Sequence, residues 1–302
     1  MLFQQKIKAV LVFALLLIGV SVLPSVAAGS TEGTLLRGFD VPKHFITCCN
    51  GPNGADYWPI GVAFDGNNLW YSHPDTSTAD IFQTTTSGVL LKTLTSINHA
   101  GALAWDGNNL WVGIFDAITP CTSSTSGCGL VFQVNPATGA VLKTLDLTSI
   151  FAADNMGLCN FIDGLDFDPA TGTLWVSPDI GCAFQFTNNV DSIGFVYNVD
   201  TSGKLLQRIQ LPFGVAGVDK VGKFLYMATE GFAPGMRTIV EITLQGKVVS
   251  SFPTVSVSGN HESAEDLAFD PVTFASNCAL WVVQDYGRNF DASLAAYQIA
   301  CP

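Results

Sequence analysis

Short apolar runs separated by turns rich in glycine, asparagine and proline make up most of the chain. The runs are dominated by β-branched and aromatic residues and lack a 3.6-residue period, so they predict β-strands rather than helices. One phrase recurs almost unchanged, as GVAFDGNNLWY from Gly61 and as ALAWDGNNLWV from Ala102. Diverged copies begin at Gly164, Val218 and Leu267. Each copy predicts two strands joined by a tight turn.

Two further apolar runs follow each of the first four phrases. The second of these runs starts at a glycine, at Gly88, Gly139, Gly203 and Gly246. Short strands that repeat in sets of four are typical of β-propeller blades. A tandem of helical repeats is the alternative, and the missing helical period argues against it. The chain is therefore predicted to be an all-β protein with a propeller fold.

The two ends of the chain decide the number of blades. The last copy ends after its third strand, at Leu294–Ala300, and Gly33–Phe39 matches a fourth strand on its own. An open ring would leave unpaired strand edges, so we expect these segments to complete one blade together. This predicts a five-bladed propeller as a single domain over residues 29–302. Six blades are the less favoured alternative, because a sixth would need about 40 further residues.

The repeated acidic and aromatic residues are predicted to be scaffold. An aspartate at the end of the first strand is suited to capping backbone N–H groups, and the aromatic residue of the second strand should pack between blades. Features that recur in every blade are what packing requires, so they are not site candidates. The set comprises Asp65, Asp106, Asp168, Asp219 and Asp270, with Trp70, Trp111, Trp175, Tyr226 and Trp281.

Residues 1–28 are predicted to be a signal peptide outside the fold. Lys6 and Lys8 precede the uncharged apolar run Ala9–Val20, and Leu23–Ala28 supplies a proline and small residues. This is the order of regions in a secretory signal. The run is short for a membrane span, which needs about 20 residues, and a retained anchor is the alternative. We expect a secreted or periplasmic protein without stable membrane insertion.

The composition of the chain limits the classes of molecule that it is expected to bind. Only 13% of the residues are charged, about half the usual quarter, which excludes a disordered chain or a coiled coil. The formal net charge is −12, so nucleic acid is not an expected partner. The chain has no phosphate-binding glycine-rich loop, and no nucleotide cofactor is expected. A small molecule, a glycan or a protein remains as the expected partner.

Strand order assigns each loop to one of two rims. Loops from first to second and from third to fourth strands share the bottom rim, and the other loops share the top rim. The eight cysteines are an even set, which in an exported chain predicts disulfides. Cys278 and Cys301 map to the bottom and are expected to pair. The other six map to the top: Cys121–Cys128 and Cys159–Cys182 are expected pairs, and Cys48 and Cys49 form a vicinal bridge or pair with other top cysteines.

The candidate ligand-binding and metal-binding residues also map to the top rim. All four histidines fall there, and imidazole is both a common metal ligand and a general base near neutral pH. The predicted ligand site at the channel mouth comprises His73, His99, Asp163, His261, Glu262, Glu265, Asp285 and Arg288. Carboxylates from several blades suit Ca²⁺, with another divalent metal as the alternative, and the predicted metal ligands are Asp163, Asp179, Glu230 and Glu265. The alternative is an acidic rim that only keeps the protein soluble.

The repeat, with Phe-Asp followed by Leu-Trp-Val and with Asn135–Gly139 as its turn, resembles the NHL, YVTN and lactonase-type propeller superfamily. It is also similar to the repeats of streptogramin lyases. The resemblance covers nearly all of residues 33–300 and implies the fold, since its motifs are blade motifs. Lactonase-type relatives bind a divalent metal at the top of the channel, and lyase relatives use His and Glu nearby.

Two functions are therefore predicted from the sequence. The first is an exported propeller that binds a ligand, a glycan or a protein through its top rim and channel mouth. The second is a Ca²⁺-dependent hydrolase or lyase of the lactonase or streptogramin-lyase type.

Overall fold

The structure is a computed structural model that describes residues 32–41, 59–74, 80–95, 97–115, 129–154, 162–178, 193–229, 237–257, 263–285 and 292–302. Contacts divide the chain into Met1–Ser30 and Thr31–Pro302, and the described residues belong to the second unit. No helix among them is both long and apolar enough to cross a membrane.

Five antiparallel sheets of four strands each form the fold. Blade one contains β2 (Val62–Phe64), β3 (Asn68–His73), β4 (Asp80–Thr85) and β5 (Leu90–Leu94). Blade two contains β6 (Ala100–Trp105), β7 (Leu110–Ile114), β8 (Leu130–Val134) and β9 (Val141–Asp146), followed by the helix α1 (Thr148–Ala153). Blade three contains β10 (Ile162–Asp168), β11 (Thr173–Pro178), β12 (Gly194–Asp200) and β13 (Leu205–Leu211).

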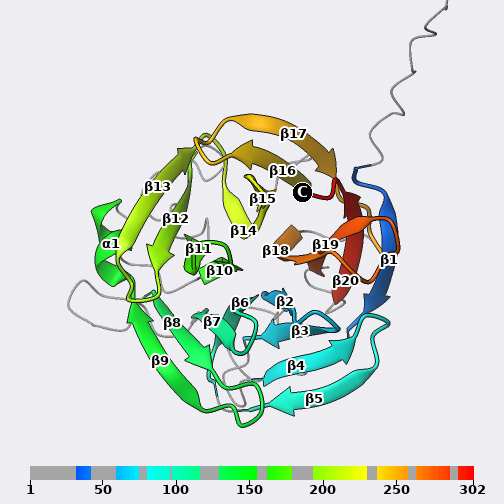
Figure 1. Cartoon of the computed structure of the whole chain (residues 1–302), viewed down its shortest axis with the longest axis horizontal. Helices are drawn as coiled ribbons and strands as arrows, with labels where there is room; N and C mark the ends of the chain where they lie inside the picture. Colours follow the sequence, from blue (N-terminus) through cyan, green and yellow to red (C-terminus); the bar gives the residue numbers. More distant parts are fainter. Residues whose placement is uncertain are drawn as a thin grey trace, which may run out of the picture. The chain divides into compact units, whose positions relative to one another are not determined.

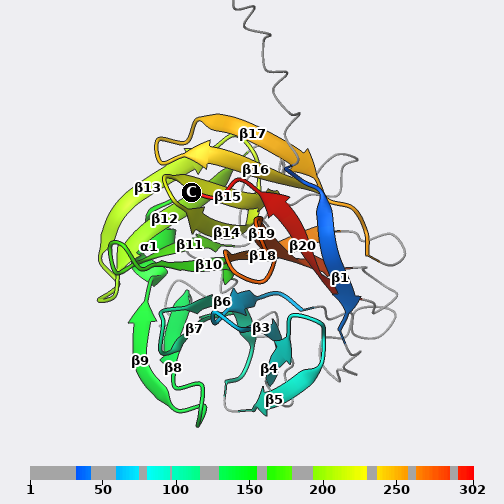
Figure 2. The same cartoon turned by 45° about the vertical axis from the view of Figure 1, so that its right-hand side comes forward.

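Blade four contains β14 (Val215–Val221), β15 (Phe224–Thr229), β16 (Thr238–Thr243) and β17 (Val248–Pro253). Blade five contains β18 (Ser263–Asp270), β19 (Cys278–Asp285), β20 (Ala292–Ile299) and, from the other end of the chain, β1 (Leu35–Asp40). Each first strand contacts the first strands on both sides, in the order β2, β6, β10, β14, β18 and back to β2. The sheets therefore form a closed ring with the first strands innermost (Figures 1 and 2).

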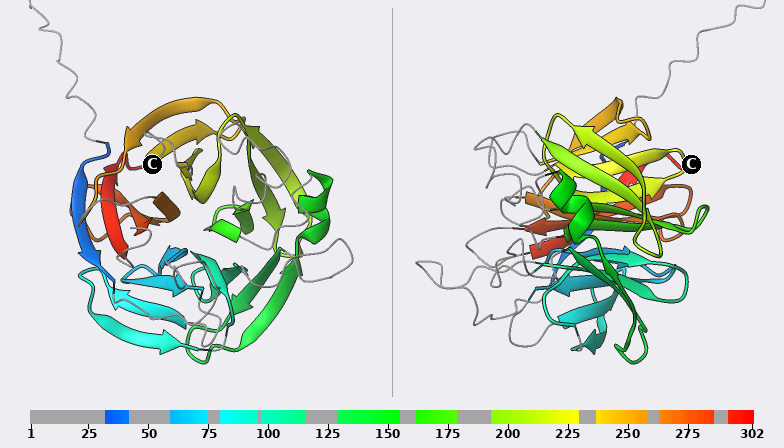
Figure 3. Two further views of the ribbon diagram at one scale, coloured as in Figure 1. Left: turned by 180° about the vertical axis from the view of Figure 1, so that it is seen from behind. Right: turned by 90° about the vertical axis from the view of Figure 1, so that its left-hand side faces the viewer.

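The ring closes within blade five, as the sequence predicted. Strand β1 pairs antiparallel with β20, with Leu35 opposite Tyr297 and Phe39 opposite Leu294. Figure 3 shows the two strands side by side at the edge of the ring. The all-β class and the count of five blades are thus confirmed. Pairing these segments leaves no strand of blade five without a hydrogen-bonded neighbour.

A disulfide joins Cys278, the first residue of β19, to Cys301, with the Cα atoms 5.1 Å apart. The predicted bottom pair is confirmed. A cross-link here ties the C-terminal end of blade five to its own second strand. The six cysteines predicted for the top rim, Cys48, Cys49, Cys121, Cys128, Cys159 and Cys182, lie outside the described residues.

The scaffold aspartates of blades one and two hold their blades together from within. In blade two the Asp106 carboxylate accepts hydrogen bonds from the Asn109 amide at 2.7 Å, Trp111 Nε1 at 3.0 Å and Gln133 Nε2 at 2.7 Å. Asp65 makes the same three contacts in blade one, with Asn68, Trp70 and Gln83. The aspartate thus links the first turn to the second and third strands, and the scaffold prediction is confirmed here.

Candidate functional site

First strands pack very closely around the middle of the channel. A Cβ atom at Gly61 would lie 2.2 Å from the Gly101 carbonyl oxygen, and one at Gly217 would lie 2.4 Å from the Glu265 carbonyl oxygen. Neither position has room for a side chain, because backbone from the next blade occupies the space. Blade five carries Asp266 at the equivalent level of β18, and the side chain is fully buried.

Asp266 connects first strands of four blades. Its carboxylate accepts hydrogen bonds from the Leu103 amide at 2.9 Å and from the Val62 and Leu165 amides, both at 3.3 Å. Burial raises the pKa of this carboxyl well above its usual value, although the backbone amides lower it in part. The Asp266 carboxylate therefore joins the first strands of these four blades where they approach one another most closely.

A cavity of about 310 Å³ lies in the channel on the bottom side of Asp266. The second halves of all five first strands line it. Four of the lining residues are aromatic, one from each of four blades: Phe64, Trp105, Phe167 and Phe269. Lys220 takes the equivalent position in blade four, as its pairing with Leu225 shows. The polar lining comprises Asp166, Asp168, Asp219 and Lys220.

Strand register shows which cavity residues are equivalent. The residue opposite the second-strand aromatic side chain is alanine in three blades: Ala63, Ala104 and Ala268. In blade three this residue is Asp166, opposite Trp175, and in blade four it is Asp219, opposite Tyr226. The prediction of Asp219 as a scaffold aspartate is therefore wrong. The position equivalent to Asp65 and Asp106 lies two residues after Asp219, and in blade four it is occupied by Val221.

Asp166 and Asp219 are carboxyl groups of adjacent blades, the first partly buried and the second buried. Asp166 accepts a hydrogen bond from the Lys220 amide at 2.9 Å, but burial dominates and raises its pKa to about 7. Burial raises the pKa of Asp219 well above its usual value, and the charges of Asp166 and Asp266 raise it further. The Phe269 amide opposes this shift. Both groups thus retain protons far above the usual range for aspartate.

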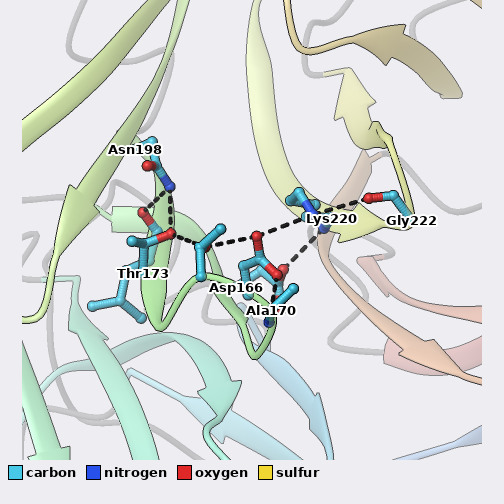
Figure 4. Close-up of polar contacts among 9 residues, drawn as sticks. Asp166, Ala170, Thr173, Asn198, Lys220 and Gly222 are labelled. Atoms are coloured by element: carbon cyan, nitrogen blue, oxygen red, sulfur yellow. Dashed lines mark hydrogen bonds and ion pairs between the residues drawn. The ribbon is translucent and has the colours of Figure 1, made fainter.

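Lys220 is bound by another aspartate (Figure 4). Its Nζ atom lies 3.0 Å from Asp168 Oδ2 and donates to the Gly222 carbonyl oxygen at 2.9 Å. Asp168 also accepts from the Ala170 amide at 3.0 Å and from Thr171 Oγ1 at 2.8 Å. Burial opposes ionisation, but the hydrogen bonds from Lys220 and Thr171 hold the pKa of Asp168 below its usual value. The Asp168–Lys220 pair links blades three and four.

This arrangement changes the scaffold role predicted for Asp168. It caps its own turn as predicted, but its second oxygen faces Lys220 instead of the tryptophan of its blade. Trp175 Nε1 has no hydrogen-bond partner among the described residues, whereas Trp70, Trp111 and Trp281 each donate to their aspartate. Asn198 stands in the place of Gln83 and Gln133 and donates to Thr173 and to the Leu174 carbonyl oxygen.

The residues predicted for the top rim are only partly within the described structure. Asp163 and Glu265 are buried and lie at equivalent positions near the start of β10 and β18, which contact each other across the channel. His73 is buried at the end of β3. His99 precedes β6 with a φ of 57°, and its carbonyl oxygen accepts from the Phe115 amide at 2.8 Å.

The other predicted ligand residues remain predictions. Asp285 ends β19, with its backbone opposite Ser263. Five residues lie outside the described ranges: Asp179, Glu230, His261, Glu262 and Arg288. Within the described ranges, no three His, Cys, Asp or Glu side chains are grouped to hold a metal ion. The calcium set has Asp179 and Glu230 among its members, so it stays a prediction.

Sequence reasoning missed Asp166 and Lys220. The position of Asp166 is alanine in three blades and aspartate in blade four, and the position of Lys220 is aromatic in the other four blades. Aligning the copies on their tryptophan or tyrosine reveals the difference in blade four, because Asp219 stands as far before Tyr226 as Ala63 stands before Trp70. In blade three the turn between the first two strands is longer, so this alignment places Asp168 and not Asp166 on Ala63. Aligning them on aspartate conceals it, because Asp219 then falls on Asp65.

Comparison with known proteins supports the fold. No protein-family model and no curated protein sequence matches the chain. The structure of Myxococcus xanthus glutaminyl cyclase is similar, with a TM-score of 0.53 and 13% identity, over 88% of this chain and 97% of that one. A nidogen/laminin complex gives 0.44 and 12% over 76% of each chain, and BamB from Moraxella catarrhalis gives 0.38 and 10% over 88% and 97%. The first likeness shows a shared propeller fold.

Proposed function

We propose that this protein is a ligand-binding propeller that holds a small molecule with a largely apolar body in the bottom half of its channel. The cavity lies on the axis of the ring and receives side chains from every blade. Its wall is mainly aromatic and aliphatic, with polar groups confined to blades three and four. An apolar pocket with a few convergent polar groups is the usual form of a small-molecule site.

The observation that carries this proposal is the loss of the repeat at the cavity. Three blades place alanine opposite the second-strand aromatic residue, and two adjacent blades place aspartate there. Packing alone would favour the same small residue in all five blades. Buried carboxyl groups reduce stability unless they are well paired, so their presence on one side of a cavity supports a role in recognition.

The sequence-based predictions for the top rim stand beside this proposal. A glycan or protein partner at the top rim, or a Ca²⁺-dependent hydrolase or lyase, would use residues such as Asp163 and Glu265. Export to the periplasm or the cell exterior agrees with the Cys278–Cys301 disulfide, because such bonds persist in oxidising compartments.

Ligand-observed NMR with indole and benzyl alcohol as probes tests the proposal. Saturation transfer from the protein to both probes is expected. It should be lost in Ala104→Phe, since Ala104 is buried and lines the cavity. Ala137→Phe, in the exposed turn between β8 and β9, is the matched control and should bind normally. Thermal melting establishes that both variants fold. Equal transfer in a folded Ala104→Phe protein, or none in the wild type, would reject the proposal.

A further inference from the structure

Asp166 and Asp219 keep unused capacity to accept hydrogen bonds. A carboxylate has two oxygens with about four lone-pair sites. The amides of Phe167 and Lys220 donate to Asp166, and the Phe269 amide donates to Asp219. In the part of the chain that the structure describes, no side-chain donor forms a hydrogen bond with either group. Asp219 is buried, Asp166 is partly buried, and both line the cavity, so a molecule inside it can reach their remaining acceptor sites.

The neighbouring cation compensates this pair only in part. Among the described residues that line the cavity, Lys220 supplies the only ammonium group, and it is engaged by Asp168 and by the Gly222 carbonyl oxygen. Its charge lowers the pKa of Asp166 and Asp219, but burial outweighs this effect, so ionising both groups in one cavity is unfavourable. A cation that enters the cavity would supply the missing charge.

The aromatic lining of the cavity suits an organic cation. Phe64, Trp105, Phe167 and Phe269 surround the cavity, and aromatic faces attract positive charge through their electron quadrupole. A small inorganic ion would leave most of the cavity and its apolar wall unused. An amine on an aromatic or aliphatic body would use both the carboxylates and the wall.

We propose that the ligand of this cavity is an organic amine whose ammonium group is bound by Asp166 and Asp219 from adjacent blades. The inference rests on the proposed function and specifies its ligand class. Asp168 and Lys220 then serve as positioning residues, since the Lys220 backbone amide fixes Asp166 and the ion pair holds the Lys220 strand.

Binding should release protons. The ammonium group favours the ionised carboxylates, whereas the empty site holds protons because burial favours the neutral forms. For each proton released, affinity should rise by about tenfold per pH unit while the site is still protonated. The rise should slow as pH passes 7, where Asp166 ionises without help.

Isothermal titration calorimetry with three probes of similar size tests the inference: 2-phenylethylamine, 2-phenylethanol and 3-phenylpropionate. The amine is expected to bind at least about tenfold more tightly than the alcohol, and the carboxylate should bind most weakly. Amine affinity should increase from pH 6 to pH 8 while alcohol affinity stays nearly constant. Titrations in buffers of different ionisation enthalpy should detect protons released with the amine alone.

Variants separate the amine inference from the proposed function. Asp166→Asn and Asp219→Asn should each remove the preference for amine over alcohol and retain alcohol binding, which shows that the cavity is intact. Asp200→Asn, at an exposed turn of blade three, should behave as the wild type. Equal affinity for amine and alcohol, abolished only by Ala104→Phe, would overturn the amine inference and leave the proposed function standing. Absence of binding by all three probes would overturn both.

Discussion

Blade two and blade three contain the same elements but use their polar residues differently. In blade two, Asp106 binds the tryptophan, the glutamine and the turn of its own blade, and Ala104 faces the channel. In blade three, Asp168 pairs with Lys220 of the next blade, and Asp166 stands in place of the alanine. One blade satisfies its polar groups internally, whereas the other directs them to the channel.

The difference shows how a repeated fold can acquire a site. An internal network makes a blade self-sufficient, and its repetition stabilises the ring. Blades three and four give up part of that network: Trp175 Nε1 has no partner among the described residues, and Val221 replaces the capping aspartate. The polar groups gathered at the cavity come from these same two blades. Departure from the repeat therefore marks the candidate site better than residue type alone.

The largest effect is expected from Asp106→Ala. The change removes acceptors for Trp111 Nε1, Gln133 Nε2 and the Asn109 amide, and leaves donors unsatisfied in a partly buried region. The free energy of unfolding should fall by about 2–3 kcal/mol. Urea denaturation at equilibrium measures it. A loss below about 0.5 kcal/mol would mean that the network adds little to the blade.

Asp219→Ala should have the opposite sign. The folded-state pKa of Asp219 is raised, so the stability linked to its proton is present below the unfolded pKa of about 4 and is lost as pH rises above it. Replacement by alanine, which blades one, two and five carry, should therefore stabilise the protein at pH 8 by about 1–3 kcal/mol, the usual cost of an incompletely hydrogen-bonded buried polar group. The gain should shrink towards pH 5.

Urea denaturation of wild type and Asp219→Ala at several pH values measures this change. Asp106→Ala should be destabilising at pH 5 and at pH 8, which makes it the matched comparison. If Asp219→Ala destabilises the protein as strongly as Asp106→Ala at pH 8, the two aspartates have the same structural role and our distinction between them is wrong.

Lys220→Phe should make blade four more like the others, because Phe64, Phe167 and Phe269 hold equivalent positions. The hydrogen bond to the charged Asp168, worth about 1.5–3 kcal/mol, is lost, and a new bond from Trp175 Nε1 should offset about 1 kcal/mol of this, so stability is expected to fall by about 1–2 kcal/mol. Asp168 is then free to accept from Trp175 Nε1, as Asp106 accepts from Trp111. The indole N–H resonance of Trp175 in a ¹⁵N correlation spectrum should move downfield. An unmoved resonance would contradict the exchange of partners.

The smallest effect is the difference between Trp111→Phe and Trp175→Phe. Both changes remove similar buried area, but only Trp111 Nε1 has an acceptor in the described structure. Trp111→Phe should therefore cost about 1 kcal/mol more than Trp175→Phe. Thermal and urea denaturation of the two variants measure this difference. Equal losses would show that Trp175 Nε1 also has a partner in solution.

Much of the fold could be predicted because it depends on repetition. The Gly33–Phe39 segment matched a fourth strand, and the need to close a ring placed it beside Leu294–Ile299. Cys278 and Cys301 could be paired because strand order put both on the bottom rim. These inferences need only the order and spacing of the strands.

The site could not be predicted in the same way, because it depends on register. Asp168 stands as far before Trp175 as Asp219 stands before Tyr226, so the two aspartates look equivalent in the sequence. The turn after β10 is longer than the turn after β14, however, and this difference shifts the pairing by two residues. Only pairing with Tyr226 shows that Asp219 corresponds to Asp166 and not to Asp168. Lys220 gave no sequence signal, since a lysine near the end of a strand is usually a solvated side chain.

The pairing of β1 with β20 in blade five has a topological consequence. The Ala300 amide donates to Glu32 Oε1 at 3.1 Å, and the Gly33 amide donates to the Gln298 carbonyl oxygen at 2.9 Å, so the two ends of the propeller meet on one rim. A short linker from Pro302 to Glu32 would make the ring continuous, and the chain could then be opened in a loop between other blades. Such a circular permutant would keep every strand beside its present neighbours. The starting blade is thus a property of the chain's numbering, and the ring itself has no first blade.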